Sequence, residues 1–282
     1  MNDIILQARD LRYDYEDGTS ALDDLNIDIQ KGKKTAIIGG NGAGKSTLFL
    51  NINGVLRPRS GQIFFNEEKV KYDKKSIYEL RKKVGLVFQE PDNQIFSSSI
   101  YQEIAFGPLN FGLSKEEANF RVEKVMDEMK ITHLREKPTH YLSYGQKKQV
   151  AIASILVLEP EVIILDEPTA GLDPMHIKKL MLLLEALSKK GTTLIVATHD
   201  VNFAYTWADC IHVLQKGKVI RSGSPQDVFL DKEILEVADM EMPYILEIIK
   251  KIGQNKSALQ QPLPRTIDEL VKILKGEQAD GK

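Results

Sequence analysis

The chain has 282 residues, with 38 lysines and arginines against 40 aspartates and glutamates, and its formal net charge is −2. This length provides for one large domain and a small addition around a buried core. The balance of charge argues against binding of nucleic acid, and the single Cys210 excludes a disulfide framework and fits a reducing cytosol. No signal peptide is expected, and every apolar stretch is far shorter than the ~18 residues of a membrane-spanning helix. We therefore expect a soluble protein that reaches a membrane only through a partner.

Residues 3–30 have the pattern of antiparallel strands, because Asp17-Gly18 is a turn signal and apolar and polar side chains alternate over residues 25–30. Residues 35–38 differ, since they are continuously apolar and are followed at once by glycines and a helical pattern. The other runs of this kind are 84–88, 162–165 and 193–197. Such runs are typical of central parallel strands that helices cover on both faces. The sequence thus predicts an α/β fold with a parallel core sheet and an antiparallel N-terminal β subdomain.

Two stretches outside this sheet have a helical pattern. Between residues 90 and 145 the chain is mostly helical and contains a capping box at 114–117, so we expect a separate helical lobe. The chain is helical again after Ser224, which has the features of a helix N-cap. A looser polar segment at 254–264 precedes a last short helix, which another capping box opens at 266–269. The expected division is 1–225 for the main domain, with the lobe at about 90–145, and 226–282 for a C-terminal helical extension.

A glycine-rich motif follows the apolar run 35–38 and opens a helix. Gly39 to Ser46 satisfies G-x-x-x-x-G-K-[ST], in which glycines let backbone N–H groups close on phosphate oxygens and the helix N-terminus attracts negative charge. Lys45 would reach the β- and γ-phosphates of ATP, and the Ser46 hydroxyl would bind Mg²⁺. A plain glycine-rich turn is the alternative, and the agreement of motif and context argues against it. The residues expected to hold the nucleotide are Gly40, Asn41, Gly42, Ala43, Gly44, Lys45, Ser46 and Thr47.

A pair of carboxylates ends the apolar run 162–165, which we expect to lie beside the strand that precedes the glycine motif. Asp166 would hold Mg²⁺ through water, and Glu167 would orient or deprotonate an attacking water. The alternative is a polar pair that caps the turn at Pro168. The phosphate motif earlier in the chain favours the catalytic interpretation.

Two further motifs accompany these two: Gln89 and the sequence Leu-Ser-Tyr-Gly-Gln at 142–146. Together the four motifs resemble the nucleotide-binding subunit of ATP-binding cassette (ABC) proteins over about residues 3–225, and the resemblance implies that Ala-Gly-Leu-Asp at 170–173 is the D-loop of that family. The resemblance implies a P-loop NTPase fold of the ABC cassette type that binds ATP and Mg²⁺. It also implies that the 142–146 signature of one chain completes the phosphate site of a second chain.

The resemblance implies roles for individual residues. Gln89 would contact Mg²⁺ and sense a transport partner, and His199 would bond the γ-phosphate as the switch histidine. Tyr15 would stack on adenine, with Tyr13 as the weaker candidate. The implied catalytic residues are Glu167, His199, Lys45 and Gln89, the implied metal ligands are Ser46, Gln89 and Asp166, and the signature and D-loop would add Ser143, Gly145, Gln146 and Asp173 to the nucleotide site.

One position of the signature departs from the family pattern. The usual signature is Leu-Ser-Gly-Gly-Gln, and Tyr144 stands at its third position, while Gln149 stands where an arginine is common. Ser143 and Gly145, which are expected to meet phosphate, are intact, so the departure bears only on how tightly a dimer closes. For Gly145 a helix-start glycine without a ligand is the alternative. The other histidines have no ligand spacing and are interpreted as structural: His133, His140, His176 and His212.

Residues 89–96 and 105–112 carry a narrower resemblance, to ATPases of energy-coupling factor (ECF) importers of vitamins and metals, including the cobalt-import ATPase. It implies that Ile95, Phe96 and Phe106-Gly107 line a groove for the coupling helix of a transmembrane partner. Ordinary packing of the helical lobe is the alternative for these residues.

We therefore expect the ATP-hydrolysing subunit of an importer, in which ATP closes a dimer and hydrolysis opens it. The implied partners are a second copy or a related ATPase, a transmembrane coupling protein and a substrate-binding membrane component, with no nucleic acid. The implied location is the cytoplasmic face of the cell membrane. An exporter ATPase and a soluble ABC ATPase without a transport role are the alternatives.

Overall fold

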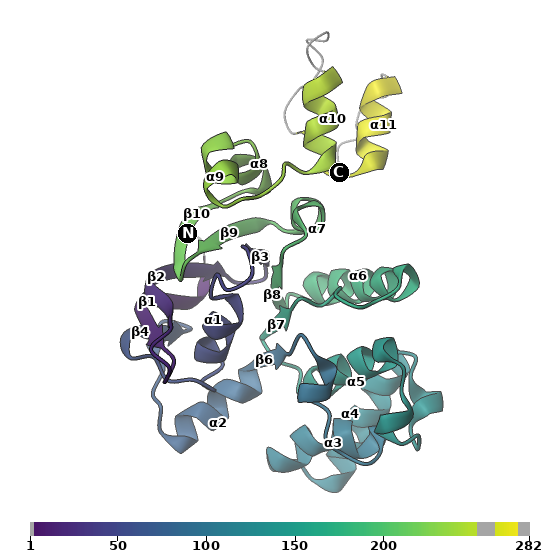
Figure 1. The fold of residues 1–282 in the computed structure, drawn as a ribbon. Helices are drawn as coiled ribbons and strands as arrows, with labels where there is room; N and C mark the ends of the chain where they lie inside the picture. Colours follow the sequence, from purple (N-terminus) through teal and green to yellow (C-terminus); the bar gives the residue numbers. More distant parts are fainter. Residues whose placement is uncertain (1–2, 253–262, 276–282) are drawn as a thin grey trace.

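The computed structural model describes residues 3–252 and 263–275, so the predicted polar segment 254–264 lies almost entirely outside the described residues, as does the end of the predicted extension after residue 275. Two β-sheets form the centre of the molecule (Figure 1). The larger sheet has the strand order β10-β9-β3-β8-β7-β6, with β10 antiparallel to β9 and all other neighbours parallel. Its strands are β3 (Lys34–Ile38), β6 (Val84–Val87), β7 (Val162–Asp166), β8 (Thr193–Thr198), β9 (Cys210–Gln215) and β10 (Lys218–Gly223).

The smaller sheet is antiparallel and has the order β2-β1-β4-β5. Its strands are β1 (Ile4–Asp14), β2 (Ser20–Gln30), β4 (Ser60–Phe65) and β5 (Glu68–Lys69). The predicted α/β fold with a parallel core and an antiparallel N-terminal subdomain is confirmed. It follows from the sequence pattern, because the strands buried on both faces are continuously apolar and the half-buried β2 alternates.

The position expected for the run 162–165 is wrong by one strand. β8 lies between β3 and β7, pairing Ala36 with Val196 on one side and Leu165 with Val196 on the other. Hydrophobic periodicity identifies buried strands but does not encode their order in a sheet. The carboxyl ends of parallel strands still meet at one edge of the sheet, so Asp166 reaches the glycine loop past the end of β8.

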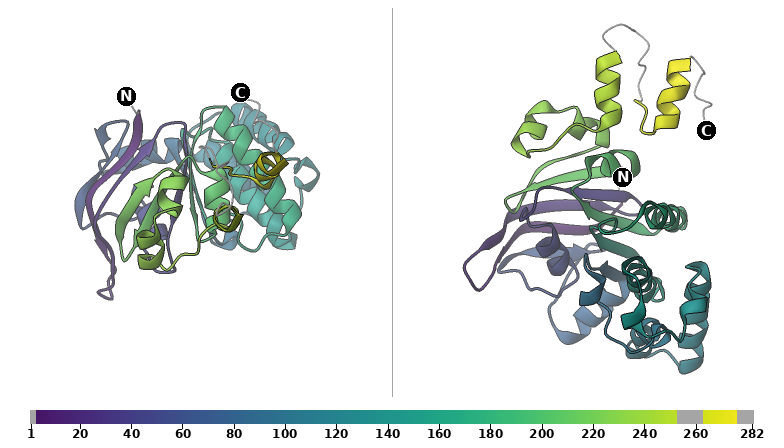
Figure 2. Two further views of the ribbon diagram at one scale, coloured as in Figure 1. Left: turned by 90° about the horizontal axis from the view of Figure 1, so that it is seen from above. Right: turned by 45° about the vertical axis from the view of Figure 1, so that its right-hand side comes forward.

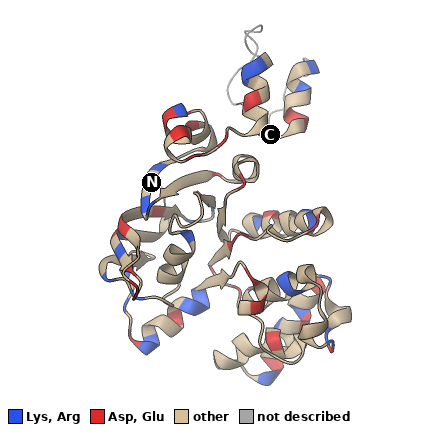
Figure 3. Ribbon diagram, in the orientation of Figure 1, with Lys and Arg blue, Asp and Glu red and all other residues tan. Residues whose placement is uncertain are grey.

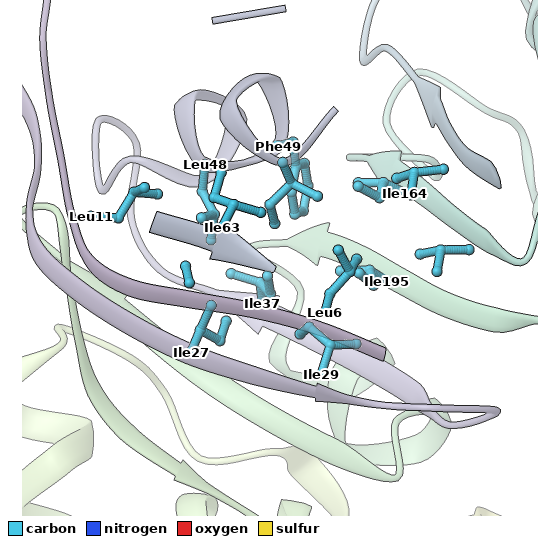
Figure 4. Packing of buried hydrophobic residues seen from close by; sticks show 14 of the residues in the cluster. Leu6, Leu11, Ile27, Ile29, Ile37, Leu48, Phe49, Ile63, Ile164 and Ile195 are labelled. Carbon is cyan, nitrogen blue, oxygen red and sulfur yellow. The ribbon is translucent and has the colours of Figure 1, made fainter. Parts of the chain in front are cut away.

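The antiparallel sheet and α1 (Lys45–Ile52) cover one face of the core sheet. Figure 4 shows side chains from the two sheets and from α1 meeting in a single buried cluster, which includes Leu6, Ile29, Ile37, Phe49 and Ile195. A second cluster covers the opposite face and includes residues of α6 (Pro174–Lys189) and α7 (Val201–Trp207).

The helical lobe has its own core. It contains α3 (Ile100–Asn110), α4 (Lys115–Glu128) and α5 (Tyr144–Leu156), and α2 (Lys74–Lys83) precedes it in the chain. The oxygen of Ser114 accepts a hydrogen bond from the Glu117 N–H at 3.2 Å, which confirms the predicted start of α4, but this half of the predicted capping box is not joined by the reciprocal bond from Ser114 N–H to the Glu117 carboxylate. Val150 and Val157 belong to the same cluster as α3 and α4, so this packing continues through α5, past residue 145.

The C-terminal helices are attached to α7, at the end of the molecule away from the helical lobe (Figure 2). They are α8 (Pro225–Phe229), α9 (Lys232–Val237), α10 (Tyr244–Ile252) and α11 (Ile267–Lys275). Ser224 caps α8, as predicted, and the structure completes the cap as a capping box with Asp227. At α11 the Thr266 oxygen accepts from the Glu269 N–H, but the Glu269 carboxylate accepts from the Arg265 N–H and not from that of Thr266. The second predicted box is therefore displaced by one residue.

Charged residues of both signs are interspersed over the molecule (Figure 3). Across residues 3–252 and 263–275, no helix combines the length and the apolar character needed to cross a membrane.

Arg265 fastens the C-terminal helices to α7, because its guanidinium donates to the carbonyls of Tyr205 at 3.0 Å and Thr206 at 3.1 Å and also to that of Ala208. Hydrogen bonds from charged groups contribute roughly 1.5–3 kcal/mol, so Arg265→Ala should lower the free energy of unfolding by about 2 kcal/mol in a urea titration. Arg59→Ala is the control, because its pair with Asp14 is exposed and should contribute less than about 1 kcal/mol. Equal losses from the two variants would contradict this attachment.

Candidate functional site

The glycine loop lies between β3 and α1 and leaves the start of α1 without a side-chain cap. Gly44 has a φ of +105°, and a Cβ there would lie 2.6 Å from the Ala21 carbonyl oxygen, so only glycine fits. Gly42 also has a left-handed φ, of +77°. Gly40, Asn41 and Gly42 are exposed. The loop therefore offers backbone N–H groups and an uncapped helix N-terminus, which together favour an anion.

Lys45 supplies a positive charge beneath this loop. Its side chain is 8% exposed, and its Nζ donates to the carbonyls of Gly39 at 2.7 Å and Gly40 at 3.2 Å. Burial lowers the pKa of Lys45, and the charges of Glu167 and Asp166 oppose that shift. The ammonium is thus held by loop carbonyls in a position where phosphate oxygens could replace them.

Asp166 and Ser46 come together although they are distant in the sequence. Asp166 is buried at the end of β7, and burial raises its pKa while a hydrogen bond from the Ser46 hydroxyl opposes the shift. A hydroxyl and a carboxylate are oxygen ligands that fit Mg²⁺, which usually binds one or two protein oxygens together with phosphates and water. In residues 3–252 and 263–275, no three or more His, Cys, Asp and Glu side chains cluster as a metal site would need. One hydroxyl and one carboxylate fit a Mg²⁺ ion that takes its other ligands from phosphate and water.

Glu167 and His199 form a second pair at the same edge of the sheet. The Glu167 Oε1 lies 2.9 Å from the His199 Nδ1, and the Glu167 N–H donates to the Ala197 carbonyl at 3.0 Å. Glu167 has a φ of +41°, a left-handed conformation that is unfavourable for a residue with a side chain and is common at functional sites. The carboxylate is buried, whereas the His199 side chain is 70% exposed. The pair places a shielded carboxylate beside a histidine that a ligand can reach.

Tyr15 stands at the margin of the glycine loop. Its hydroxyl forms a 2.9 Å hydrogen bond with the Thr47 hydroxyl, and its ring is 40% exposed. Tyr13 meets this ring edge-on at 5.1 Å and packs against the core cluster. Of the two tyrosines, Tyr15 thus has the face available for a flat ligand next to the loop.

The predicted signature and D-loop residues form a separate group. Ser143 caps α5 in a complete capping box with Gln146, which presents the N-terminus of that helix. A Cβ at Gly145 would lie 3.0 Å from the His176 ring, and His176 Nδ1 lies 2.6 Å from the Asp173 carboxylate. Figure 1 shows α5 and α6, whose first turns carry this group, on the other side of β6 and β7 from α1, and no hydrogen bond within the described ranges joins the group to the glycine loop. His176, interpreted above as structural, therefore lies against the signature glycine.

Gln89 follows the end of β6, and its side chain is exposed. The hydrogen bonds that join Lys45, Ser46, Asp166, Glu167 and His199 do not include this side chain. Its carbonyl accepts a hydrogen bond from Lys148 at 2.6 Å, and Lys148 is 1% exposed. Sequence reasoning missed Lys148 because a lysine in a helix is usually solvated. The available signal was its position one helical turn after Tyr144, on the same face of α5.

Comparison with known proteins identifies the family. The profile described as ABC transporter matches residues 22–170. The energy-coupling factor transporter ATP-binding protein EcfA3 of Clostridium perfringens is 48% identical over 255 residues, covering 89% of this chain and 90% of that protein.

Two solved structures agree in fold with this chain. One is cbiO1 of Clostridium perfringens, described as part of the ABC transporter complex cbiONQ, with a TM-score of 0.74, 48% identity and coverage of 88% of this chain and 99% of that one. The other is a dimeric ATP-binding cassette in a post-hydrolysis state with ADP and phosphate, with a TM-score of 0.72, 28% identity and coverage of 78% and 99%. The chain belongs to the ABC transporter family and is an ATP-binding, ATP-hydrolysing subunit of the energy-coupling factor type.

Proposed function

We propose that two chains hydrolyse ATP at composite sites, each formed by the glycine loop of one chain and the signature of the other. The observation that carries this proposal is the separation of the two groups within one chain. The glycine loop, Lys45, Asp166 and Glu167 gather at one edge of the sheet, whereas Ser143 and Gly145 lie at the start of α5 in the lobe. The start of α1 has no side-chain cap, and Ser143 at the start of α5 is exposed, so a phosphate could reach both helix N-termini. A second copy of this chain, or a related ATPase, would bring the missing half.

Within one such site the residues have distinct roles. Lys45 and the loop N–H groups bind the phosphates, and Tyr15 supports the adenine. Ser46, Asp166 and Gln89 would hold Mg²⁺, which neutralises phosphate charge when bound. Glu167 orients the attacking water and accepts its proton, and His199, which holds the Glu167 carboxylate at 2.9 Å, contacts the γ-phosphate. Gln146 and Asp173 fix the signature and D-loop, as their capping bonds indicate.

Glu167→Gln separates binding from hydrolysis, because the amide keeps the shape of the side chain but cannot accept the proton. We expect hydrolysis to fall by roughly 10²–10⁴-fold, the usual contribution of a general base. We also expect ATP to accumulate the closed dimer, which gel filtration with ATP would detect. Asp200→Asn is the control, since the neighbouring Asp200 caps α7 with its side chain and takes no part in the site. Normal hydrolysis by Glu167→Gln would assign the base to another residue.

We further propose that the lobe docks a transmembrane partner through an aromatic surface formed by Phe96 and Phe106. These rings are 66% and 48% exposed and meet edge-on at 4.7 Å. The buried Glu103 carboxylate accepts from the N–H groups of Phe96 at 3.1 Å and Ser97 at 2.8 Å, which fixes the loop that carries the first ring. Ile95 is partly buried against the lobe core, so it supports the surface more than it lines it.

The names of two relatives support a proposal for the partners and the cargo. EcfA3 is named for an energy-coupling factor transporter, and cbiO1 is described as part of the complex cbiONQ. By this relation the chain would act at the cytoplasmic face of the cell membrane, with a coupling protein and a substrate-binding membrane component. A vitamin or a transition metal ion such as cobalt would be the cargo.

Phe96→Asp tests the docking surface, because a charge there opposes burial against an apolar helix. We expect the variant to bind ATP normally and to lose most of its co-sedimentation with membranes of the native host. Phe120→Asp is a matched control, since Phe120 is 65% exposed on α4 of the same lobe. Membrane recovery of Phe96→Asp at the level of the Phe120→Asp control would return Phe96 to ordinary surface packing.

A further inference from the structure

The start of α5 is tied to residues 88–92 by side chains of the signature helix. Lys148 Nζ donates to the Gln89 carbonyl at 2.6 Å and is 3.4 Å from that of Phe88. The Tyr144 hydroxyl donates to the same Gln89 carbonyl at 3.4 Å, a longer and weaker bond. Lys147 pairs with Asp92 at 2.5 Å, at the surface. The signature therefore holds the backbone that carries the Gln89 side chain.

Lys148 is the buried member of this link. Burial lowers its pKa to about 8, against the charges of Glu90, Asp166 and Glu167. A buried ammonium is stable only where acceptors surround it, and the carbonyls at the end of β6 are the acceptors it bonds. Because its side chain is enclosed within one chain, Lys148 cannot itself touch a second chain.

Tyr144 extends the link to the D-loop. A Cβ at Gly171 would lie 2.7 Å from the Tyr144 ring, so the ring rests directly on the backbone of that loop. The glycine that the family usually has at this position could supply neither the hydroxyl nor the ring. A pocket of about 560 Å³ lies beside this contact, between α5 and α6, and Gly145, Gln146 and Lys148 are among its lining residues. The ring of Tyr144 thus joins the start of α5 to the D-loop as well as to Gln89.

We propose that Lys148 and Tyr144 are positioning residues that make the place of the signature depend on the backbone of Gln89. A shift of Gln89 on binding of ATP in one chain then moves Ser143 and Gly145 of that chain, which serve the site of its partner. The two composite sites are coupled through this link. The inference rests on the composite site proposed above.

The test uses the Glu167→Gln background, in which ATP should accumulate dimer, and compares Lys148→Met with Lys147→Met. Methionine keeps the length and the helix propensity of lysine but removes the ammonium. The matched control Lys147→Met loses only an exposed ion pair. Calorimetry with ADP measures the glycine loop alone, and gel filtration over a series of ATP concentrations measures dimer closure.

We expect Lys148→Met to bind ADP as the background does and to need at least about tenfold more ATP for half-maximal dimer, within the usual range of coupling between sites. Lys147→Met should match the background in both assays. Unchanged ATP dependence of the dimer in Lys148→Met would overturn the inference, and so would loss of ADP affinity, because Lys148 would then act on the loop itself. A background that fails to dimerise with ATP would instead refute the composite site.

Tyr144→Gly gives a second route if Lys148→Met does not fold, since Tyr144 is only half-buried. It restores the usual family residue and removes both contacts of the ring. We expect a rise in the ATP needed for half-maximal dimer, in the same direction as for Lys148→Met. Where Lys148→Met folds, the combined effect of the two substitutions should be smaller than the sum, because both act on the Gln89 carbonyl. No change in Tyr144→Gly, or strict additivity of the two, would contradict a shared link.

Discussion

The carboxyl ends of β3, β8 and β7 lie at one edge of the core sheet, and the position of every residue of the glycine-loop site depends on this alignment. β3 leads into the glycine loop, β7 ends at Asp166, and β8 leads to His199. Parallel pairing fixes the register, with Ile38 opposite Thr198 and Asp166 opposite Ala197. Burial of these strands on both faces makes the edge rigid, so the loops that follow can hold charged groups in close proximity.

Burial of neighbouring charged groups at this edge has a desolvation cost, which hydrogen bonds within the site offset. Lys45, Asp166 and Glu167 are all nearly buried, and desolvation lowers the pKa of Lys45 and raises that of Asp166. Loop carbonyls, the Ser46 hydroxyl and His199 satisfy these groups in the described structure. The same donors and acceptors suit phosphate oxygens and a magnesium ion, so nucleotide binding exchanges one set of partners for another. Because the ligand changes the hydrogen-bond partners of these groups, its binding can shift the equilibrium positions of the loops that carry them.

Much of this arrangement could be predicted from the sequence, where local patterns determine local structure. The glycine loop and its helix, the buried strands and the capped starts of α4 and α8 lie where their residues indicate. The order of the strands could not be predicted, because β7 and β8 have the same apolar pattern. Only the pairing in the structure shows that β8 lies next to β3 and that β7 lies next to β8. Lys148 and His176 were not identified as site residues, since their positions depend on tertiary contacts with Gln89 and Gly145 that no periodicity reports.

If two chains form each ATP site together, a mixture of two inactive variants should contain one intact site per mixed dimer. Lys45→Ala removes the cation of the glycine loop, and Ser143→Arg blocks the signature. In a mixed dimer of these variants one site contains both substitutions and the other contains neither. We expect each variant alone to be inactive and the mixture, shown to be dimeric by gel filtration with ATP, to regain ATP hydrolysis. A dimeric mixture without activity, or full activity of Ser143→Arg alone, would contradict a site formed by two chains.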